Sequence, residues 1–134
     1  MSGSPWRVLI ADDNEEIRDL IRYGLEIDGR FHVVGEAPNG ERAIRMAADL
    51  RPDAVVLDVA MPVMSGLDAL PLIRRALDGQ VVAVILSALD RDVTAAQADQ
   101  LDALFVPKLE ACALARRLAS LCQAARAGSY LAAS

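Results

Sequence analysis

The sequence predicts an α/β fold in which a parallel sheet carries helices on both faces. Short apolar runs rich in Val, Ile and Leu alternate with stretches of helical periodicity, and the pattern of strand followed by helix occurs five times. Apolar runs of this kind are typical of strands that are buried on both faces. A repeated alternation of strand and helix favours parallel strands joined by helical crossovers.

The predicted elements follow one another without a low-complexity linker. Strands are expected at 6–12, 31–36, 54–58, 81–87 and 103–106. Helices are expected at 15–28, 40–50, 65–77, 90–100 and 110–126. Asn14 and Asn39 are the expected caps of the first two helices, Ser65-Gly66 starts the third, and Gly128 offers a stop for the last. The 90–100 helix has a thin apolar face and is expected to be held least firmly.

Length and composition limit the classes of protein to which this chain can belong. The 134 residues suffice for one domain, expected at 6–127 between tails at 1–5 and 128–134. A hydrophobic content of 54% excludes a disordered chain. Without a signal peptide or an apolar run long enough to span a bilayer, a cytoplasmic protein without membrane contact is expected. The net charge is −5 and basic residues are scattered, so direct nucleic-acid binding is not expected.

Polar side chains follow four of the predicted strands at the point where each strand ends. Asp12 and Asp13 end the first run, Asp58 ends the third, Ser87 ends the fourth, and Lys108 follows the fifth. Ligands of open α/β sheets bind outside the carboxyl ends of the strands. The sequence therefore places three carboxylates, a hydroxyl and an ammonium group around one cleft.

This set of groups fits phosphoryl chemistry on an aspartate. Clustered carboxylates repel one another, and a divalent cation relieves the repulsion. Oxygen ligands without histidine or thiolate favour Mg²⁺, and the expected ligands are Asp12, Asp13, Asp58 and the backbone carbonyl of Ala60. Asp58 is the candidate nucleophile. Lys108 would neutralise charge on the phosphoryl oxygens, and Ser87 would donate a hydrogen bond to one of them.

These segments resemble the receiver domain of bacterial two-component response regulators, a likeness that covers nearly the whole chain. The matching segments are Val8-Leu9-Ile10-Ala11-Asp12-Asp13, Val55-Val56-Leu57-Asp58-Val59-Ala60-Met61-Pro62 with Gly66, Ile85-Leu86-Ser87-Ala88, and Ala103-Leu104-Phe105-Val106-Pro107-Lys108. The resemblance implies a flavodoxin-like (βα)5 fold with strand order 2-1-3-4-5. It also implies a signalling domain that catalyses only its own phosphorylation and dephosphorylation.

The resemblance further implies how the domain works. Asp58 would accept a phosphoryl group from a histidine kinase or a histidine phosphotransfer protein, with Mg²⁺ bound by Asp13, Asp58 and the Ala60 carbonyl and assisted by Asp12 through water. Ser87 and Phe105 would switch the face formed by the fourth helix, the fifth strand and the fifth helix. A downstream protein, an output domain or a second phosphorylated copy would bind that face.

Two departures from the family pattern bear on function. Leu109 stands where many relatives have a proline after the lysine, so the loop there is free to take another path. Ala60 and Leu89 are apolar where relatives carry polar groups that position the hydrolytic water. Slow self-dephosphorylation is therefore expected.

Three alternative functions follow from the sequence. An aspartyl-phosphate phosphatase of the haloacid dehalogenase type needs a second carboxylate two residues after the nucleophile, where Ala60 stands. A degenerate receiver that only docks proteins conflicts with the intact polar set. A receiver excised from, or left over from, a helix-turn-helix transcription regulator is the main runner-up, because the segments 33–37 and 125–131 resemble receivers of that class.

Overall fold

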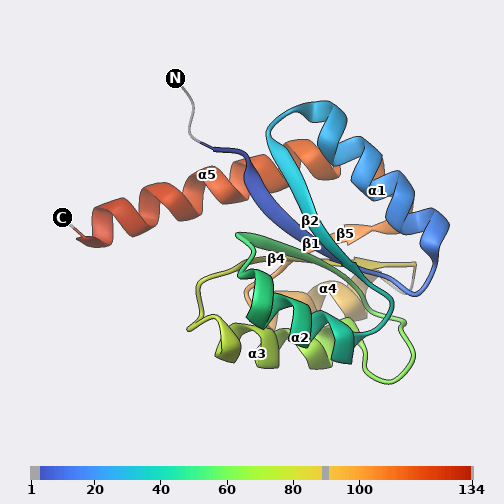
Figure 1. Ribbon diagram of the computed structural model, residues 1–134. Coiled ribbons are helices and arrows are strands. Elements are labelled where there is room, and N and C mark those ends of the chain that lie inside the picture. Colours follow the sequence, from blue (N-terminus) through green and yellow to red (C-terminus); the bar gives the residue numbers. More distant parts are fainter. Residues whose placement is uncertain (1–3, 89–90, 134) are drawn as a thin grey trace.

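The computed structural model describes residues 4–88 and 91–133 and contains one parallel sheet in the predicted order β2-β1-β3-β4-β5 (Figure 1). The strands are β1 (Trp6–Ala11), β2 (Phe31–Ala37), β3 (Ala54–Asp58), β4 (Val82–Ser87) and β5 (Leu104–Pro107). The helices are α1 (Glu15–Asp28), α2 (Gly40–Leu50), α3 (Gly66–Ala76), α4 (Arg91–Gln100), the 3₁₀ helix η1 (Lys108–Ala113) and α5 (Leu114–Ala133).

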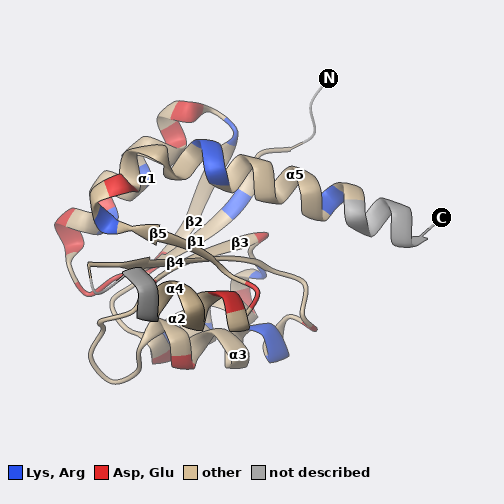
Figure 2. Cartoon of the chain, turned by 180° about the vertical axis from the view of Figure 1, so that it is seen from behind, with Lys and Arg blue, Asp and Glu red and all other residues tan. Residues whose placement is uncertain are grey.

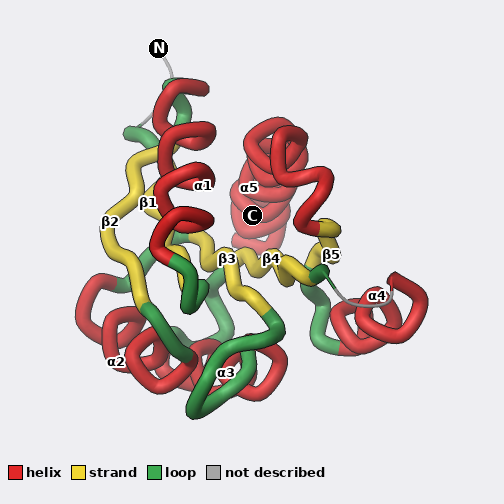
Figure 3. The backbone as a smooth tube through the Cα atoms, turned by 90° about the vertical axis from the view of Figure 1, so that its right-hand side faces the viewer, coloured by secondary structure: helices red, strands yellow, loops and turns green. Residues whose placement is uncertain are grey.

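Helices cover both faces of the sheet, as the alternating pattern predicted. Figure 3 shows α1 and α5 on one face, α2 and α3 on the other, and α4 beside β5. Successive side chains of a strand point to opposite faces. In β1, Val8 and Ile10 therefore enter the core under α1 and α5, whereas Leu9 and Ala11 enter the core over α2 and α3. Both faces are buried, which explains why the strands read as continuous apolar runs.

The predicted helix starts are confirmed by side-chain caps. The Asn14 side chain accepts hydrogen bonds from the backbone N–H groups of Glu16 and Ile17. The Asn39 and Ser65 side chains cap α2 and α3 in the same way. These caps satisfy N–H groups that lack partners within the helix. They also fix where α1 and α3 begin, next to the strand ends that carry Asp12 and Asp58.

The end of the chain differs from the prediction in two ways. The residues directly after β5 form η1, a 3₁₀ turn with non-helical backbone angles at Glu110, rather than the start of an α-helix. The last helix was expected to end near residue 126, but α5 continues through Gly128 to Ala133. A glycine costs only about 1 kcal/mol in a helix relative to alanine, and helix-forming neighbours outweigh it here.

Trp6 is the first residue of β1 and connects α5 to the amino edge of the sheet, opposite the edge where the strands end. Its side chain is 7% exposed at the start of β1. Its ring packs on Phe31 with 5.6 Å between ring centroids, and the Arg126 guanidinium lies 4.8 Å above it. Figure 1 shows α5 running past this edge of the sheet. Among the described helices, none combines the length and the apolar character needed to cross a membrane.

Candidate functional site

The carboxyl edge of the sheet gathers the polar groups that the sequence placed at strand ends. Asp58 is the last residue of β3 and Ser87 the last of β4, while Asp12 directly follows β1 and Lys108 directly follows β5. The register pairs Asp58 with Leu86 and Ser87 with Pro107, so these strands end side by side. Asp12 and Asp58 are buried, with 0% and 1% exposure. Asp13, one residue further along the chain, is exposed.

Three carboxylates and one ammonium group form the centre of this site. Ligand oxygens of Asp12, Asp13 and Asp58 lie within 4.8 Å of one another. The Lys108 Nζ atom lies 3.1 Å from Oδ2 of Asp12 and 3.1 Å from Oδ2 of Asp58. Neither of these two buried oxygens accepts a well-aligned hydrogen bond. The cluster thus retains oxygen lone pairs for a hard cation, and its donor set and spacing fit Mg²⁺.

Burial and charge act on the site in opposite directions. Burial raises the pKa of Asp58, and the nearby Asp12 carboxylate raises it further, although Lys108 opposes both effects. Burial lowers the pKa of Lys108, but its contacts with Asp58 and Asp12 outweigh burial and leave that pKa raised. Lys108 therefore stays protonated, and a second cation near Asp58 would favour the carboxylate over the acid.

The loop between β3 and α3 packs tightly against the end of β3. A Cβ atom added to Gly66 would lie 2.4 Å from the carbonyl oxygen of Asp58, so only glycine lets α3 begin this close. The Val59 N–H donates to the Leu86 carbonyl at 3.0 Å, and the Ala60 N–H donates to Oδ1 of Asp58 at 3.3 Å. The loop thereby limits how far the Asp58 side chain can turn.

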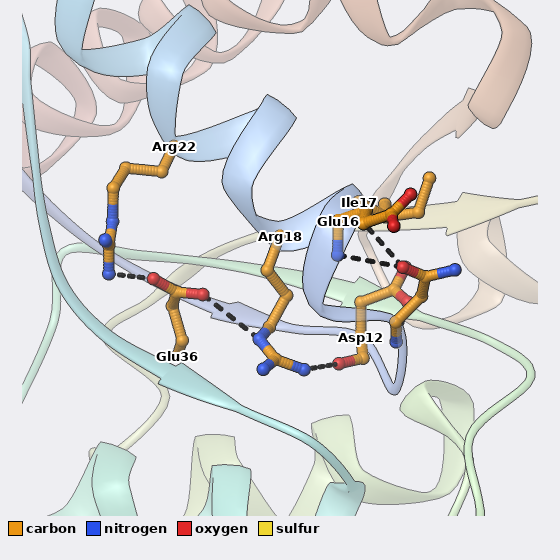
Figure 4. Close-up of polar contacts among 7 residues, drawn as sticks. Asp12, Glu16, Ile17, Arg18, Arg22 and Glu36 are labelled. Atoms are coloured by element: carbon orange, nitrogen blue, oxygen red, sulfur yellow. Dashed lines mark hydrogen bonds and ion pairs between the residues drawn. The ribbon is translucent and has the colours of Figure 1, made fainter.

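Two further polar residues reach the site from α1 and β2, and sequence reasoning did not identify them. Arg18 donates from Nη1 to the Asp12 carbonyl at 2.7 Å and from Nε to Oε1 of Glu36 at 3.0 Å (Figure 4). Arg22 pairs with the other oxygen of Glu36. Figure 2 shows the acidic loop after β1 running into the acidic first turn of α1. Helical periodicity alone assigns such arginines to solvent, and only the strand order brings Glu36 beside them.

The two predicted switch residues lie on the same side of the sheet. Ser87 is 2% exposed, and Phe105 is buried in the core between the sheet and the helices α2, α3 and α4. Phe105 pairs with Ile85 in the register, two residues before the pair formed by Ser87 and Pro107. Leu89, expected to lie near the phosphoryl group, falls outside the described residues.

Comparison with known families agrees with the fold. The response regulator receiver domain model matches residues 8–110, and the chain belongs to this family. The receiver domain of the response regulator NarL from Mycobacterium tuberculosis superposes with a TM-score of 0.79 at 26% identity, covering 90% of this chain and 98% of that one. Both the recognised family and the flavodoxin-like order of strands are thus confirmed.

Curated relatives carry the same domain in longer proteins. A protein-glutamate methylesterase/protein-glutamine glutaminase of Maricaulis maris is 44% identical over 85 residues, which are 63% of this chain and 21% of that protein. The transcriptional regulatory protein YdfI of Bacillus subtilis is 36% identical over 86 residues, which are 64% of this chain and 39% of that protein. The chain thus spans less than half the length of either relative.

Proposed function

We propose that this receiver domain accepts a phosphoryl group on Asp58 and passes the signal on through a conformational change. The observation that carries the proposal is the contact of Lys108 with both buried carboxylates beside the exposed Asp13. A structural ion pair needs one carboxylate and one ammonium group. Three carboxylates around one ammonium leave negative charge that a bound cation would neutralise, and a neutralised site can accept an anionic phosphoryl group.

The residues have distinct roles in the proposed transfer. An Oδ atom of Asp58 attacks the phosphorus of a phosphohistidine on the donor protein while the bond from phosphorus to the histidine nitrogen breaks. The phosphoryl group thus moves without a change of oxidation state. Lys108 neutralises the charge on the phosphoryl oxygens, and Ser87 donates a hydrogen bond to one of them. Asp12, Asp13, Asp58 and the Ala60 carbonyl would hold Mg²⁺. When bound, the ion lowers the repulsion between the carboxylates and the incoming phosphoryl group.

The proposed phosphodonor is a histidine kinase or a histidine phosphotransfer protein. Lys108 also lines one end of an apolar groove of about 470 Å³ between α1 and the η1–α5 segment. On the α1 side of this groove, Leu20, Tyr23 and Ile27 are exposed. A protein that brings a phosphohistidine to Asp58 would cover the neighbouring surface, and burying these side chains would favour its binding.

The signal would leave through the face formed by α4, β5 and α5. Phosphorylation would draw the Ser87 hydroxyl toward the phosphoryl group, and Phe105 would fill the space that it leaves. A downstream protein, an output domain or a second phosphorylated copy would then bind this face. The alignment with the transcriptional regulatory protein YdfI supports a second candidate, in which the output is a helix-turn-helix domain. An aspartyl-phosphate phosphatase is disfavoured, because Ala60 offers no carboxylate.

Intact-mass measurement tests the proposal. Incubation with acetyl phosphate and Mg²⁺ should add one phosphoryl group, about 80 Da, to the wild-type protein and none to Asp58→Asn. Omitting Mg²⁺ should leave the wild-type protein unmodified during the same incubation. Equal labelling of the wild type and Asp58→Asn, or no labelling of either, would show that Asp58 is not the acceptor.

A further inference from the structure

The geometry points to Arg18 as a positioning residue that orients the Asp12–Asp13 peptide and thereby sets the place of the Asp13 carboxylate in the metal site. This inference rests on the proposed function of that site. It concerns a residue outside the acidic cluster itself, on the second turn of α1 and facing β2 (Figure 4).

The backbone of Asp12 is held from both sides. Its N–H donates to the Ala37 carbonyl of β2 at 3.0 Å, and its carbonyl accepts from the Arg18 guanidinium at 2.7 Å. A peptide group is planar, so holding the Asp12 carbonyl also fixes the direction of the Asp13 N–H and the position of the Asp13 Cα atom. Arg18 thus acts on Asp13 through one rigid group.

Asp13 depends on this restraint more than the other two carboxylates do. Asp58 lies within β3, and Asp12 is fully buried where β1 ends. Asp13 is exposed and follows the strand, so core packing does not hold its side chain. Fixing its peptide therefore limits how far its carboxylate strays from the other two.

Arg18 is itself fixed by a partly buried partner, Glu36. The side chains of Arg18 and Glu36 are each 14% exposed, and their 3.0 Å contact uses the Nε atom, which leaves Nη1 for the Asp12 carbonyl. A guanidinium makes these two contacts from separate nitrogen atoms held in a planar fork, whereas a lysine carries all its donors on one atom and lacks that fixed geometry. Arg22 pairs with the same Glu36 but forms no hydrogen bond or ion pair with the described residues 12–14 of the acidic loop, and its side chain is 45% exposed.

A charge effect of Arg18 would have the opposite sign from a positioning effect. Removing a cation near the carboxylates makes the site more negative, which strengthens the binding of a divalent ion. Loosening the Asp12–Asp13 peptide weakens binding instead. Arg22 provides a matched control, because its removal takes the same charge from the same partner and leaves the Asp12 carbonyl contact in place.

Calorimetric titration with Mg²⁺ distinguishes the two effects. We expect Arg18→Ala and Arg18→Lys to weaken Mg²⁺ affinity by roughly tenfold or more, the usual cost of losing a residue that supports a metal ligand. Arg22→Ala should stay close to wild-type affinity. In the metal-free protein, the amides of residues 12–14 should exchange faster in both Arg18 variants than in Arg22→Ala. Arg18→Lys keeps the test informative if Arg18→Ala fails to fold.

The outcomes separate this inference from the proposed site. Absent Mg²⁺ binding by the wild type, or wild-type affinity in Asp13→Ala, would overturn the site assignment itself. Normal binding by the wild type, with equal or tighter binding by both Arg18 variants, would overturn only the role of Arg18. An equal loss of affinity in Arg22→Ala would also overturn it, because the contact with Asp12 would then not be the cause.

Discussion

Ala60 stands two residues after the proposed phosphoacceptor and is exposed, with its N–H group directed at Oδ1 of Asp58. Its methyl group can neither donate nor accept a hydrogen bond. Hydrolysis of an aspartyl phosphate needs a water in line with the bond that breaks, and groups that orient this water speed the step. At this position the proposed site offers no side-chain polar group to orient that water.

We therefore expect the phosphorylated protein to lose phosphate slowly, and Ala60→Asn to speed the loss several-fold. The measurement is phosphate release from purified phosphoprotein with Mg²⁺ present. Ala60→Val, which adds bulk without polarity, is the control and should not speed release. Equal rates for Ala60→Asn and the wild type would mean that another group orients the water.

Cys122 allows a prediction about pH. Burial raises the pKa of this thiol from 9.0 to about 11, with Asp53 adding to the effect and Arg126 opposing it. The folded protein thus keeps the proton to higher pH than the unfolded chain does. The stability that the neutral thiol contributes is present below pH 9.0 and is lost as the pH rises toward 11.

We expect the wild type to lose about 2 kcal/mol of unfolding free energy relative to Cys122→Ala across this interval. Denaturant unfolding of both proteins, carried out below pH 9.0 and again at about pH 11, measures the difference. The cavity left by Cys122→Ala adds an offset that does not depend on pH. Parallel stability curves would contradict the prediction. Cys112 is exposed and serves as the control position.

Among the connecting elements, the loop between β3 and α3 contains a strained residue. Val63 has a φ of 71°, a conformation that a β-branched side chain rarely adopts, and it is 74% exposed. Glycine adopts this conformation without steric cost, and replacing an exposed valine loses little packing.

Val63→Gly should raise the unfolding free energy by about 0.5–1 kcal/mol, the steric relief less the greater freedom of glycine in the unfolded chain. Denaturant unfolding gives the value. Val63→Ala keeps a Cβ atom in the same conformation and should gain less. If the alanine variant gains as much as the glycine variant, backbone strain is not the cause.

The element expected to change most on phosphorylation is α4 together with β5. Thr94 and Ala98 are buried residues of α4, and Phe105 of β5 lies in the same core as Ala98. Among the α4 residues whose burial is described, from 94 to 100, the buried side chains are small, and a helix packed in this way has little packing energy to lose when it shifts.

Hydrogen exchange with and without beryllofluoride and Mg²⁺ should therefore differ chiefly in residues 91–107. Asp58→Asn, which cannot carry the phosphoryl mimic, should give no difference. A change limited to residues 58–66 would mean that the signal does not spread beyond the acceptor loop.

Element boundaries were predictable where a local signal exists. The starts of three helices are indicated by cap residues whose side chains accept hydrogen bonds from the first N–H groups of the helix, namely Asn14, Asn39 and Ser65. No such signal separates η1 from α5, since Lys, Leu, Glu and Ala between residues 108 and 113 all favour an α-helix. The 3₁₀ turn reflects how the chain leaves β5, which depends on tertiary packing.

For the molecule as a whole, the sheet and its order were predictable because buried parallel strands leave a distinct apolar pattern. The acidic cluster was predictable for a related reason, since Asp12, Asp58 and Lys108 all fall at the same end of their strands. The contact between Arg18 and Glu36 was not predictable from the sequence. It joins a helix to a strand, and it depends on the lengths and conformations of two side chains, which periodicity does not reveal.

The position of Trp6 gives the domain a built-in optical reporter. It is the single tryptophan of the chain, and β1 runs from it to the acidic edge at Asp12. Because Arg126 lies over its ring, its emission should respond to small displacements of α5. Phosphorylation should therefore shift the Trp6 emission in the wild type but not in Arg126→Ala. Such a shift would show, without any label, that the conformational change reaches from the acidic edge to the opposite end of the molecule.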